Sequence, residues 1–225
     1  MNIAVVMPVI DEAARLDASL APLLSVADRV VVVDGGSRDE SRSIAAQLGA
    51  EVIESERGRA VQMNAGARCC AQADVLVFVH ADVVMPPRWR EAIEQAVAAG
   101  SRWGRFDVTL ESERLGLRIV ADLMNLRSRL TGIATGDQSI FLTRGAWHLC
   151  GGWPEVALME DIRLSSRLRR EGFRPACLSE RVSVSPRRWE RDGLVRTILL
   201  MWSLRALHAL GVSPPYLHRL YYRNR

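Results

Sequence analysis

Two aspartates, Asp34 and Asp82, come directly after long apolar segments of the sequence. Asp34 follows residues 30–33, and Asp82 ends a segment that begins at Val75 and is interrupted only by His80. Apolar runs of this length are typical of strands buried on both faces, as in a parallel sheet. Ligands of open α/β sheets bind outside the carboxyl ends of the strands. Two carboxylates at that edge could hold the polar groups of a nucleotide and a divalent metal ion.

Two further pairs of charged residues have spacings that suit chemistry at the same edge. Arg57 and Arg59 precede a predicted helix, and guanidinium groups beside a helix N-terminus suit a diphosphate. They fit an ordinary solvated loop equally well. Glu160 and Asp161 open another predicted helix, where the helix dipole favours carboxylates. Alternatively, one of them acts as a general base that removes a proton from a hydroxyl group.

Three polar or aromatic residues between these pairs could contact a second substrate. Asp137 and Gln138 precede a predicted short strand, where they fit either a turn or hydrogen bonds to a sugar. Trp153 follows Gly151 and Gly152, so its flat face could accept a sugar ring or be part of the core. The sequence leaves both alternatives open for each residue.

The elements that position these residues alternate along the first half of the chain. We expect strands at residues 3–9, 30–34, 51–55 and 75–79, and helices at residues 12–26, 37–48, 60–73 and 87–99. The second of these helices begins with a capping-box pattern, Ser37 to Glu40. The βαβαβαβ order predicts an α/β fold with a doubly wound, mostly parallel, Rossmann-like sheet.

The second half has a less regular pattern, which we interpret as an extension of the same sheet. We expect strands at residues 103–110, 139–142, 176–178 and 182–184, and helices at residues 115–130, 159–171 and 194–210. Residues 145–154 are predicted to be a loop, and Pro214-Pro215 to end the last helical region. This half would form the other wall of a cleft.

The composition is that of an ordinary globular protein. The chain has 225 residues, of which 48% are apolar and 25% charged. Residues 186–225 contain eight arginines and two acidic residues, but no interleaved aromatic pattern that would indicate nucleic-acid binding. The cysteines lack zinc-site spacing, and no signal peptide or membrane-spanning segment is predicted. We therefore expect a cytoplasmic protein.

Taken in order, these motifs resemble those of the inverting, nucleotide-sugar-dependent glycosyltransferases, a family typified by cellulose synthase-like and bacterial surface-polysaccharide enzymes. The resemblance extends from residue 1 to about residue 190. Its motifs are residues 8–12, 33–37, 57–59, 80–82, 151–153, 160–161 and 187–189. Within the family, the chain is most similar to the bacterial subfamily named for arsenosugar biosynthesis. The elements shared with that subfamily are residues 136–138, 185–189 and 211–215.

The resemblance implies a glycosyltransferase A-type fold and a reaction. Residues 1–190 would be the catalytic domain, with a nucleotide-sugar half (1–100), an acceptor half (101–190) and a C-terminal helix and tail (191–225). Asp161 would be the catalytic base with Glu160 beside it, and Asp82 would bind Mg²⁺ or Mn²⁺. The residues implied to bind the nucleotide, for which UDP is expected, are Pro8, Val9, Glu12, Asp34, Arg57, Arg59, His80 and Ala81. Those implied to contact the acceptor or cover the diphosphate are Asp137, Gln138, Trp153, Arg187, Arg188 and Trp189.

Two positions depart from the common family pattern. Gly35 stands where the family has a second aspartate, and His80-Ala81-Asp82 stands in place of Asp-x-Asp. The sequence therefore supports nucleotide binding more strongly than it supports a metal ion.

Alternatives from other classes are a nucleotide-sugar-binding module without turnover and a nucleotidyltransferase. The Glu160-Asp161 pair argues against the first, and the absence of a Gly-rich basic loop after the first strand argues against the second. A dehydrogenase is disfavoured because G-x-G-x-x-G is missing there.

The apolar helix at residues 194–210 is expected to pack on the domain or in a homodimer. Its alternative is contact with the inner face of an anionic membrane.

Overall fold

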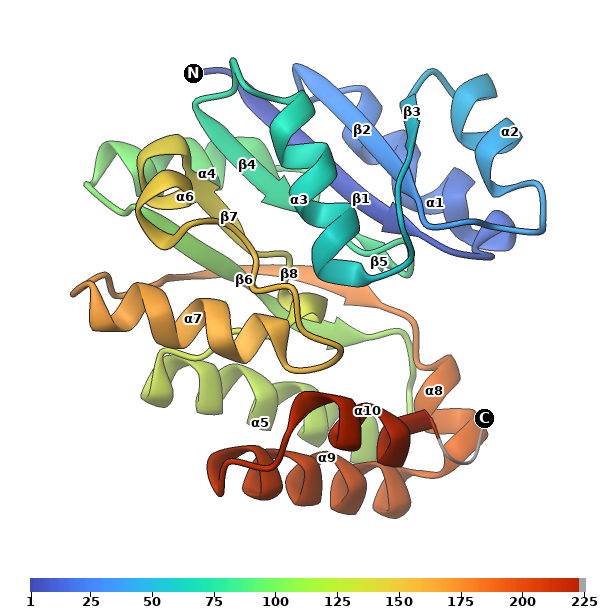
Figure 1. Ribbon diagram of the computed structural model, residues 1–225, viewed down its shortest axis with the longest axis vertical. Helices are drawn as coiled ribbons and strands as arrows, with labels where there is room; N and C mark the ends of the chain where they lie inside the picture. The colour runs from blue at the N-terminus through green and yellow to red at the C-terminus, as the bar shows by residue number, and fades with distance from the viewer. Residues whose placement is uncertain (223–225) are drawn as a thin grey trace.

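The computed structural model describes residues 1–222, which form one mixed sheet of eight strands covered by helices (Figure 1). The strands are β1 (Ile3–Val9), β2 (Arg29–Asp34), β3 (Glu51–Glu54), β4 (Val75–Phe78), β5 (Val83–Val84), β6 (Trp103–Leu110), β7 (Phe141–Thr143) and β8 (Ala176–Val184). Their order across the sheet is β3-β2-β1-β4-β7-β6-β8-β5. The predicted α/β class and the extension of the sheet by the second half of the chain are therefore confirmed.

The first four strands are all parallel, because β1 pairs with both β2 and β4, and β2 pairs with β3. The loops that follow β1, β2 and β4 therefore leave the sheet at the same edge. Beyond β4 the sheet becomes mixed, since β7 is antiparallel to both of its neighbours and β8 runs parallel to β6.

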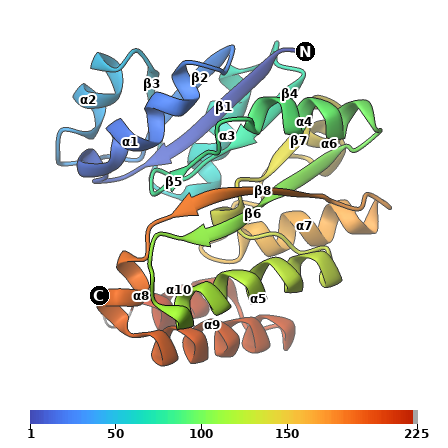
Figure 2. The same cartoon turned by 180° about the vertical axis from the view of Figure 1, so that it is seen from behind.

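Helices cover both faces of the sheet (Figures 1 and 2). One core contains side chains from α1 (Ala13–Leu24), α2 (Ser41–Gln47), α4 (Trp89–Ala98) and α5 (Leu115–Thr131). The opposite core contains side chains from α3 (Arg59–Cys69), α6 (Arg144–Cys150) and α7 (Glu160–Arg170). The remaining helices are α8 (Arg187–Asp192), α9 (Leu194–Ala209), α10 (Pro214–Tyr222) and a short 3₁₀ helix at Gly136–Gln138.

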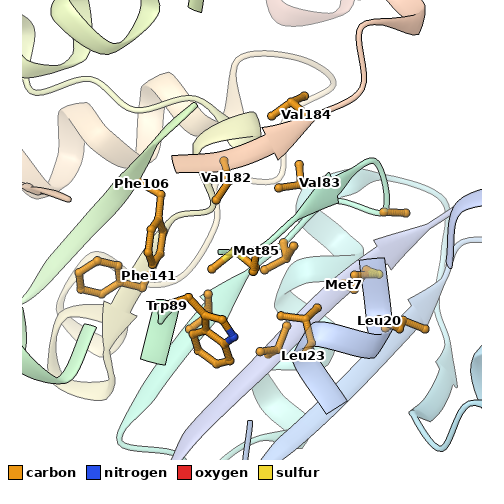
Figure 3. Packing of buried hydrophobic residues seen from close by; sticks show 14 of the residues in the cluster. Met7, Leu20, Leu23, Val83, Met85, Trp89, Phe106, Phe141, Val182 and Val184 are labelled. Atoms are coloured by element: carbon orange, nitrogen blue, oxygen red, sulfur yellow. The ribbon is translucent and has the colours of Figure 1, made fainter. Parts of the chain in front are cut away.

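The alternation of side chains along β1 explains why the sheet has two cores. Val5 and Met7 enter the first core, whereas Ala4 and Val6 enter the second. This two-residue period places apolar side chains on both faces of a strand that is apolar throughout. Figure 3 shows the first core, where Met7 of β1 lies in the same cluster as Leu20 of α1 and Trp89 of α4.

Gly66 allows α3 to lie directly on the sheet. A β-carbon at this position would come within 2.4 Å of a methyl group of Val6 and 2.9 Å of one of Val33. No side chain fits there, so the glycine sets the height of α3 above β1 and β2. The same helix carries Arg59 at its first residue.

Three local predictions were wrong. Residues 145–154 are not a loop: α6 occupies Arg144–Cys150, capped at its start by the Thr143 hydroxyl, which accepts the Ala146 N–H. The two expected strands near residue 180 are one strand, β8, with an irregular register opposite Phe106 and Asp107. Pro214 begins α10 instead of ending the helical region, since proline is favoured in a first helical turn.

The prediction that Ser37 begins a helix with a capping box was also wrong. The helix begins later, at Ser41, and the Ser37 hydroxyl instead donates to the carboxylate of Asp34. A buried carboxylate requires hydrogen-bond donors, and this requirement takes precedence over the local capping pattern.

We predict that Gly66→Ala destabilises the fold by about 1–3 kcal/mol, because the added methyl group must displace Val6 or lift α3. Gly145→Ala is the matched control, since a β-carbon at this helical glycine meets no atom within 4 Å. The control should be neutral or more stable by up to about 1 kcal/mol. Urea unfolding of both variants measures the difference. Equal stability of the two variants would contradict this account of how α3 packs.

Candidate active site

Asp34, at the end of β2, organises the turn that follows it. Its side chain is fully buried, and its oxygens accept hydrogen bonds from the backbone N–H groups of Gly36 at 2.9 Å and Ser37 at 3.0 Å. The Ser37 hydroxyl in turn accepts the N–H of Asp11, after β1. These contacts are those of an aspartate that stabilises its own turn, and a direct nucleotide contact of Asp34 remains a prediction.

Gly35 has no room for the second aspartate of the common family pattern. A β-carbon there would lie 2.9 Å from both the amide group of Gln62 and a methyl group of Ile10. The Gln62 amide is itself fixed, because it donates to the carbonyl groups of Val9 and Val33. Glycine at position 35 is therefore required by the packing of Gln62, on α3, against the ends of β1 and β2.

Arg187, at the start of α8, connects the loop after β1 with the loop after β4. Its Nη2 atom lies 2.6 and 2.8 Å from the two carboxylate oxygens of Glu12, and 3.8 Å from Oδ2 of Asp82. These three residues were predicted to line one site, and the structure brings them together. Asp82 also borders a pocket of about 330 Å³ between α1 and β5, which Arg15 and Glu111 help to line.

The carboxylate of Asp82 suits a divalent metal ion, but the described part of the chain places no complete set of metal ligands around it. Across residues 1–222, no three His, Cys, Asp or Glu side chains gather closely enough to hold a metal ion. A Mg²⁺ ion, however, is commonly bound by one or two carboxylates together with substrate phosphates and water. Asp82 could thus supply the protein ligand of a metal ion that arrives with a diphosphate.

His80 and Gly136 form the next part of the site. Nδ1 of His80 lies 3.7 Å from Oδ1 of Asp137, and a β-carbon on Gly136 would come within 2.2 Å of the imidazole. The glycine therefore lets the 3₁₀ helix approach the histidine closely. Asp137 keeps 49% of its side chain exposed, so it is accessible to a ligand.

Asp161 lies in the first turn of α7, beside this 3₁₀ helix. Its Oδ2 accepts the N–H of Gly136 at 3.1 Å, and its Oδ1 accepts the N–H of Ile162 at 2.7 Å. Burial, followed by the negative charge of Glu160, raises the pKa of Asp161 to about 6. Glu160 is buried and lies 3.3 Å from Nη1 of Arg59 at the start of α3.

Arg188 is held by the C-terminal helix, a contact that the sequence did not predict. Its guanidinium group lies 4.2 Å from the ring centroid of Tyr221 in α10 and donates to the tyrosine hydroxyl. An apolar cluster that includes Met159, Leu204 and Leu217 fixes α9 and α10 against the start of α7. The cluster of tyrosines and arginines at the end of the sequence was the only available signal.

Several other residues predicted to bind a ligand are instead enclosed by the protein. Trp153 is buried, with its ring centroid 5.1 Å from that of Phe78. The Asn64 side chain accepts the Trp153 N–H and donates to the Trp153 carbonyl group. Gln138 is fully buried and accepts the N–H of Thr135. Val9 and Ala81 are core residues, Trp189 packs against the core, Pro8 is half-buried, and Arg57 is exposed.

Among the residues described, no helix combines the length and the apolar character needed to cross a bilayer. The sequence model of Glycosyl transferase family 2 matches residues 4–148. No curated protein sequence matches the chain.

Solved structures share the fold at low sequence identity. Staphylococcus aureus TarS, residues 1–349, aligns with a TM-score of 0.64 and 16% identity, over 83% of this chain and 61% of that one. Its complex with UDP aligns with a TM-score of 0.61, 17% identity and the same coverage. Mycobacterium tuberculosis glucosyl-3-phosphoglycerate synthase, in complex with Mg²⁺ and UDP, aligns with a TM-score of 0.57 and 18% identity, over 81% of this chain and 70% of that one. The chain thus spans about three-fifths of the TarS chain that it matches.

The family model covers more than half of the chain, and the sheet order and the edge on which the acidic residues gather agree with this match. This chain belongs to Glycosyl transferase family 2, a family of inverting glycosyltransferases with the glycosyltransferase A-type fold.

Proposed function

We propose that this protein transfers a sugar from a nucleoside diphosphate sugar to an acceptor hydroxyl group, with inversion at the anomeric carbon and with Asp161 as the general base. The observation that carries this proposal is the position of Asp161, which accepts the N–H of Gly136 where Gly136 packs on His80 after β4, and its pKa of about 6. A base with this pKa is largely ionised at neutral pH and can still accept a proton readily.

The donor diphosphate would replace carboxylates as the partner of nearby arginines. Arg187 is 47% exposed in its pair with Glu12, and Arg59 is 46% exposed beside Glu160. An ion pair with an exposed arginine, such as Arg187–Glu12, contributes only about 0–1 kcal/mol, so a dianionic ligand can exchange for it. The Arg59–Glu160 pair differs because Glu160 is buried, so Arg59 would contact the diphosphate while it still faces Glu160. The UDP bound by the TarS structure and by the glucosyl-3-phosphoglycerate synthase structure supports UDP as the nucleotide.

Asp82 would hold Mg²⁺ or Mn²⁺ against the diphosphate, as the metal in the synthase structures suggests. A bound divalent ion neutralises charge on a leaving diphosphate. The arginines contribute to the same stabilisation, since they face the charge that develops as the bond to the sugar breaks.

Asp161 would take the proton of the acceptor hydroxyl while that oxygen attacks the anomeric carbon from the side opposite the diphosphate. The new carbon–oxygen bond forms as the bond to the diphosphate breaks, which inverts the configuration in one displacement. The Gly136 N–H fixes one oxygen of Asp161 and thereby orients the carboxylate. Glu160 increases its basicity through negative charge and is itself balanced by Arg59.

We predict that Asp161→Asn lowers turnover by about 10²–10⁴-fold, the range for loss of a general base. Turnover can be measured as UDP release from a panel of UDP-sugars, with water as the acceptor. UDP affinity should change by less than about twofold, because in this proposal Asp161 contacts the acceptor and not the nucleotide. Asp17→Asn, at an exposed position of α1, is the matched control and should behave like the wild type. Wild-type turnover in Asp161→Asn would refute the assignment of the base.

We also predict a pH dependence of stability that originates at Asp161. Its folded-state pKa of about 6 lies above the ordinary aspartate value of about 3.9, so the folded state binds this proton more tightly than the unfolded state. The wild type should therefore lose stability relative to Asp161→Asn as the pH rises from about 4 to about 6, with no further change above that. Urea unfolding across this range tests it, and parallel pH profiles of the two proteins would contradict it.

We further propose that the outer faces of α5 and α9 contact an anionic lipid surface. Large apolar side chains are exposed on both helices, including Leu123 at 55%, Leu199 at 60% and Trp202 at 70%. The two helices are neighbours, since a β-carbon on Gly116 would lie 2.8 Å from a methyl group of Leu194. Exposed arginines on the same two helices, Arg118 on α5 and Arg196 on α9, complement anionic headgroups and favour this partner over a second copy of the chain.

This surface predicts that the protein co-sediments with vesicles of phosphatidylcholine and phosphatidylglycerol, but not with phosphatidylcholine alone. The double variant Leu199→Ser, Trp202→Ser should lose most of this binding and retain its unfolding free energy, because both side chains are already exposed. Analytical ultracentrifugation serves as the second measurement. Concentration-dependent dimerisation that these substitutions abolish, without any lipid binding, would identify a homodimer interface and overturn the membrane proposal.

A further inference from the structure

Two arginines on the helices that pack near the start of α7 have no acidic partner. Arg127 lies on α5 and Arg205 on α9, and neither forms an ion pair within the described part of the chain. The Nε and Nη2 atoms of Arg127 are buried and find no hydrogen-bond partner among residues 1–222. Burial of a guanidinium group without partners is costly, so such an arrangement requires an explanation.

Another buried arginine in the same region shows how the fold normally satisfies such a group. Arg105 of β6 is fully buried, and it pairs with Asp107 and donates to the Ser128 hydroxyl and the Asn125 carbonyl group. Ser128 follows Arg127 directly in α5. Arg129, two residues farther along α5, likewise pairs with Asp107 and donates to the Cys177 carbonyl group, so unused donors are not a general feature of this helix.

Both arginines lie on helices that pack near the start of α7: Leu204, beside Arg205, shares an apolar cluster with Met159 and Ile162, and the Ala134 N–H that follows α5 donates to Ser165 of α7. Burial, then the positive charge of Arg205, lowers the pKa of Arg127 to about 10, whereas the charges of Asp161 and Asp137 act in the opposite direction. Burial also lowers the pKa of Arg205, again against the charge of Asp161. Both guanidinium groups thus feel the field of Asp161 without pairing with it, and a bound anion would relieve their repulsion.

We propose that Arg127 and Arg205 bind an anionic group of the acceptor, a phosphate or a carboxylate, and thereby turn the acceptor hydroxyl toward Asp161. This inference rests on the proposed transfer reaction, which it extends to the chemical class of the acceptor. Guanidinium groups bind such anions through paired charge-assisted hydrogen bonds. The other source of the same chemistry is the donor diphosphate, for which Arg59 and Arg187 are already placed on α3 and α8.

Ligand binding tests the proposal without any need for turnover. Titration with glycerol 3-phosphate at constant ionic strength, followed by calorimetry, should show saturable binding to the wild type, whereas glycerol should not bind. Arg127→Met and Arg205→Met should each weaken this binding by roughly tenfold or more, the loss expected for a charge-assisted contact. Arg196→Met, at an exposed position of α9, is the matched control and should bind like the wild type.

Two further measurements separate the alternatives. UDP affinity should be unchanged in Arg127→Met and Arg205→Met, and a tenfold loss would assign the pair to the donor diphosphate and overturn the proposal. The midpoint of thermal unfolding of ligand-free Arg127→Met should equal or exceed that of the wild type, since an unpaired buried charge is removed. A lower midpoint would show that Arg127 is a structural residue.

Absence of saturable glycerol 3-phosphate binding to the wild type would also overturn the acceptor assignment. An error in the proposed transfer reaction would give a different result. Wild-type turnover in Asp161→Asn would refute the assignment of Asp161 as the base, whereas glycerol 3-phosphate would still bind to the two arginines.

Discussion

The ion pairs of Arg187 with Glu12 and Asp82 join the three segments on which the candidate site depends. Glu12 follows β1, Asp82 follows β4, and Arg187 begins α8 after the last long strand. Parallel pairing of β1 with β2 and β4 brings the first two segments to one edge, and β8 delivers the third. Because Arg187 remains 47% exposed, this contact holds the segments together weakly and leaves the guanidinium available to a stronger anion.

Other acidic side chains of the candidate site also have basic or backbone N–H partners. Glu160 is paired with Arg59, Nδ1 of His80 lies 3.7 Å from Asp137, and Asp161 accepts hydrogen bonds from two backbone N–H groups. Burial and the negative charge of Glu160 raise the pKa of Asp161, whereas its two backbone hydrogen bonds and the charge of Arg59 act in the opposite direction. The helices α9 and α10 belong to this arrangement, since Tyr221 holds Arg188 and an apolar cluster fixes both helices on α7.

The sequence predicts the parallel half of the fold well, because strands that are apolar on both faces and helices of regular period leave a strong signal. It also identifies the residues at the strand ends that meet around Arg187 and Asp161. It could not decide whether Asp34 stabilises its own turn or contacts a ligand, since this depends on burial of the carboxylate against Ser37. Trp153, Gln138 and Arg127 show the same limit, because the sequence gives residue types but not which side chains are enclosed.

Gly35 illustrates how a departure from a family pattern can have a packing origin. Gln62 ties β1 to β2 through two carbonyl groups, and its amide occupies the volume that a side chain at position 35 would need. With one carboxylate missing there, and another before Asp82, arginines would be the principal partners of a diphosphate. We therefore propose that the nucleotide binds at the Arg187 ion pairs.

A crystal structure with UDP and Mn²⁺ tests that claim most directly. The account predicts a diphosphate that contacts Arg187, which has left Glu12, and an anomalous Mn²⁺ signal beside Asp82. A nucleotide bound elsewhere, with the Arg187–Glu12 pair unchanged, would contradict it.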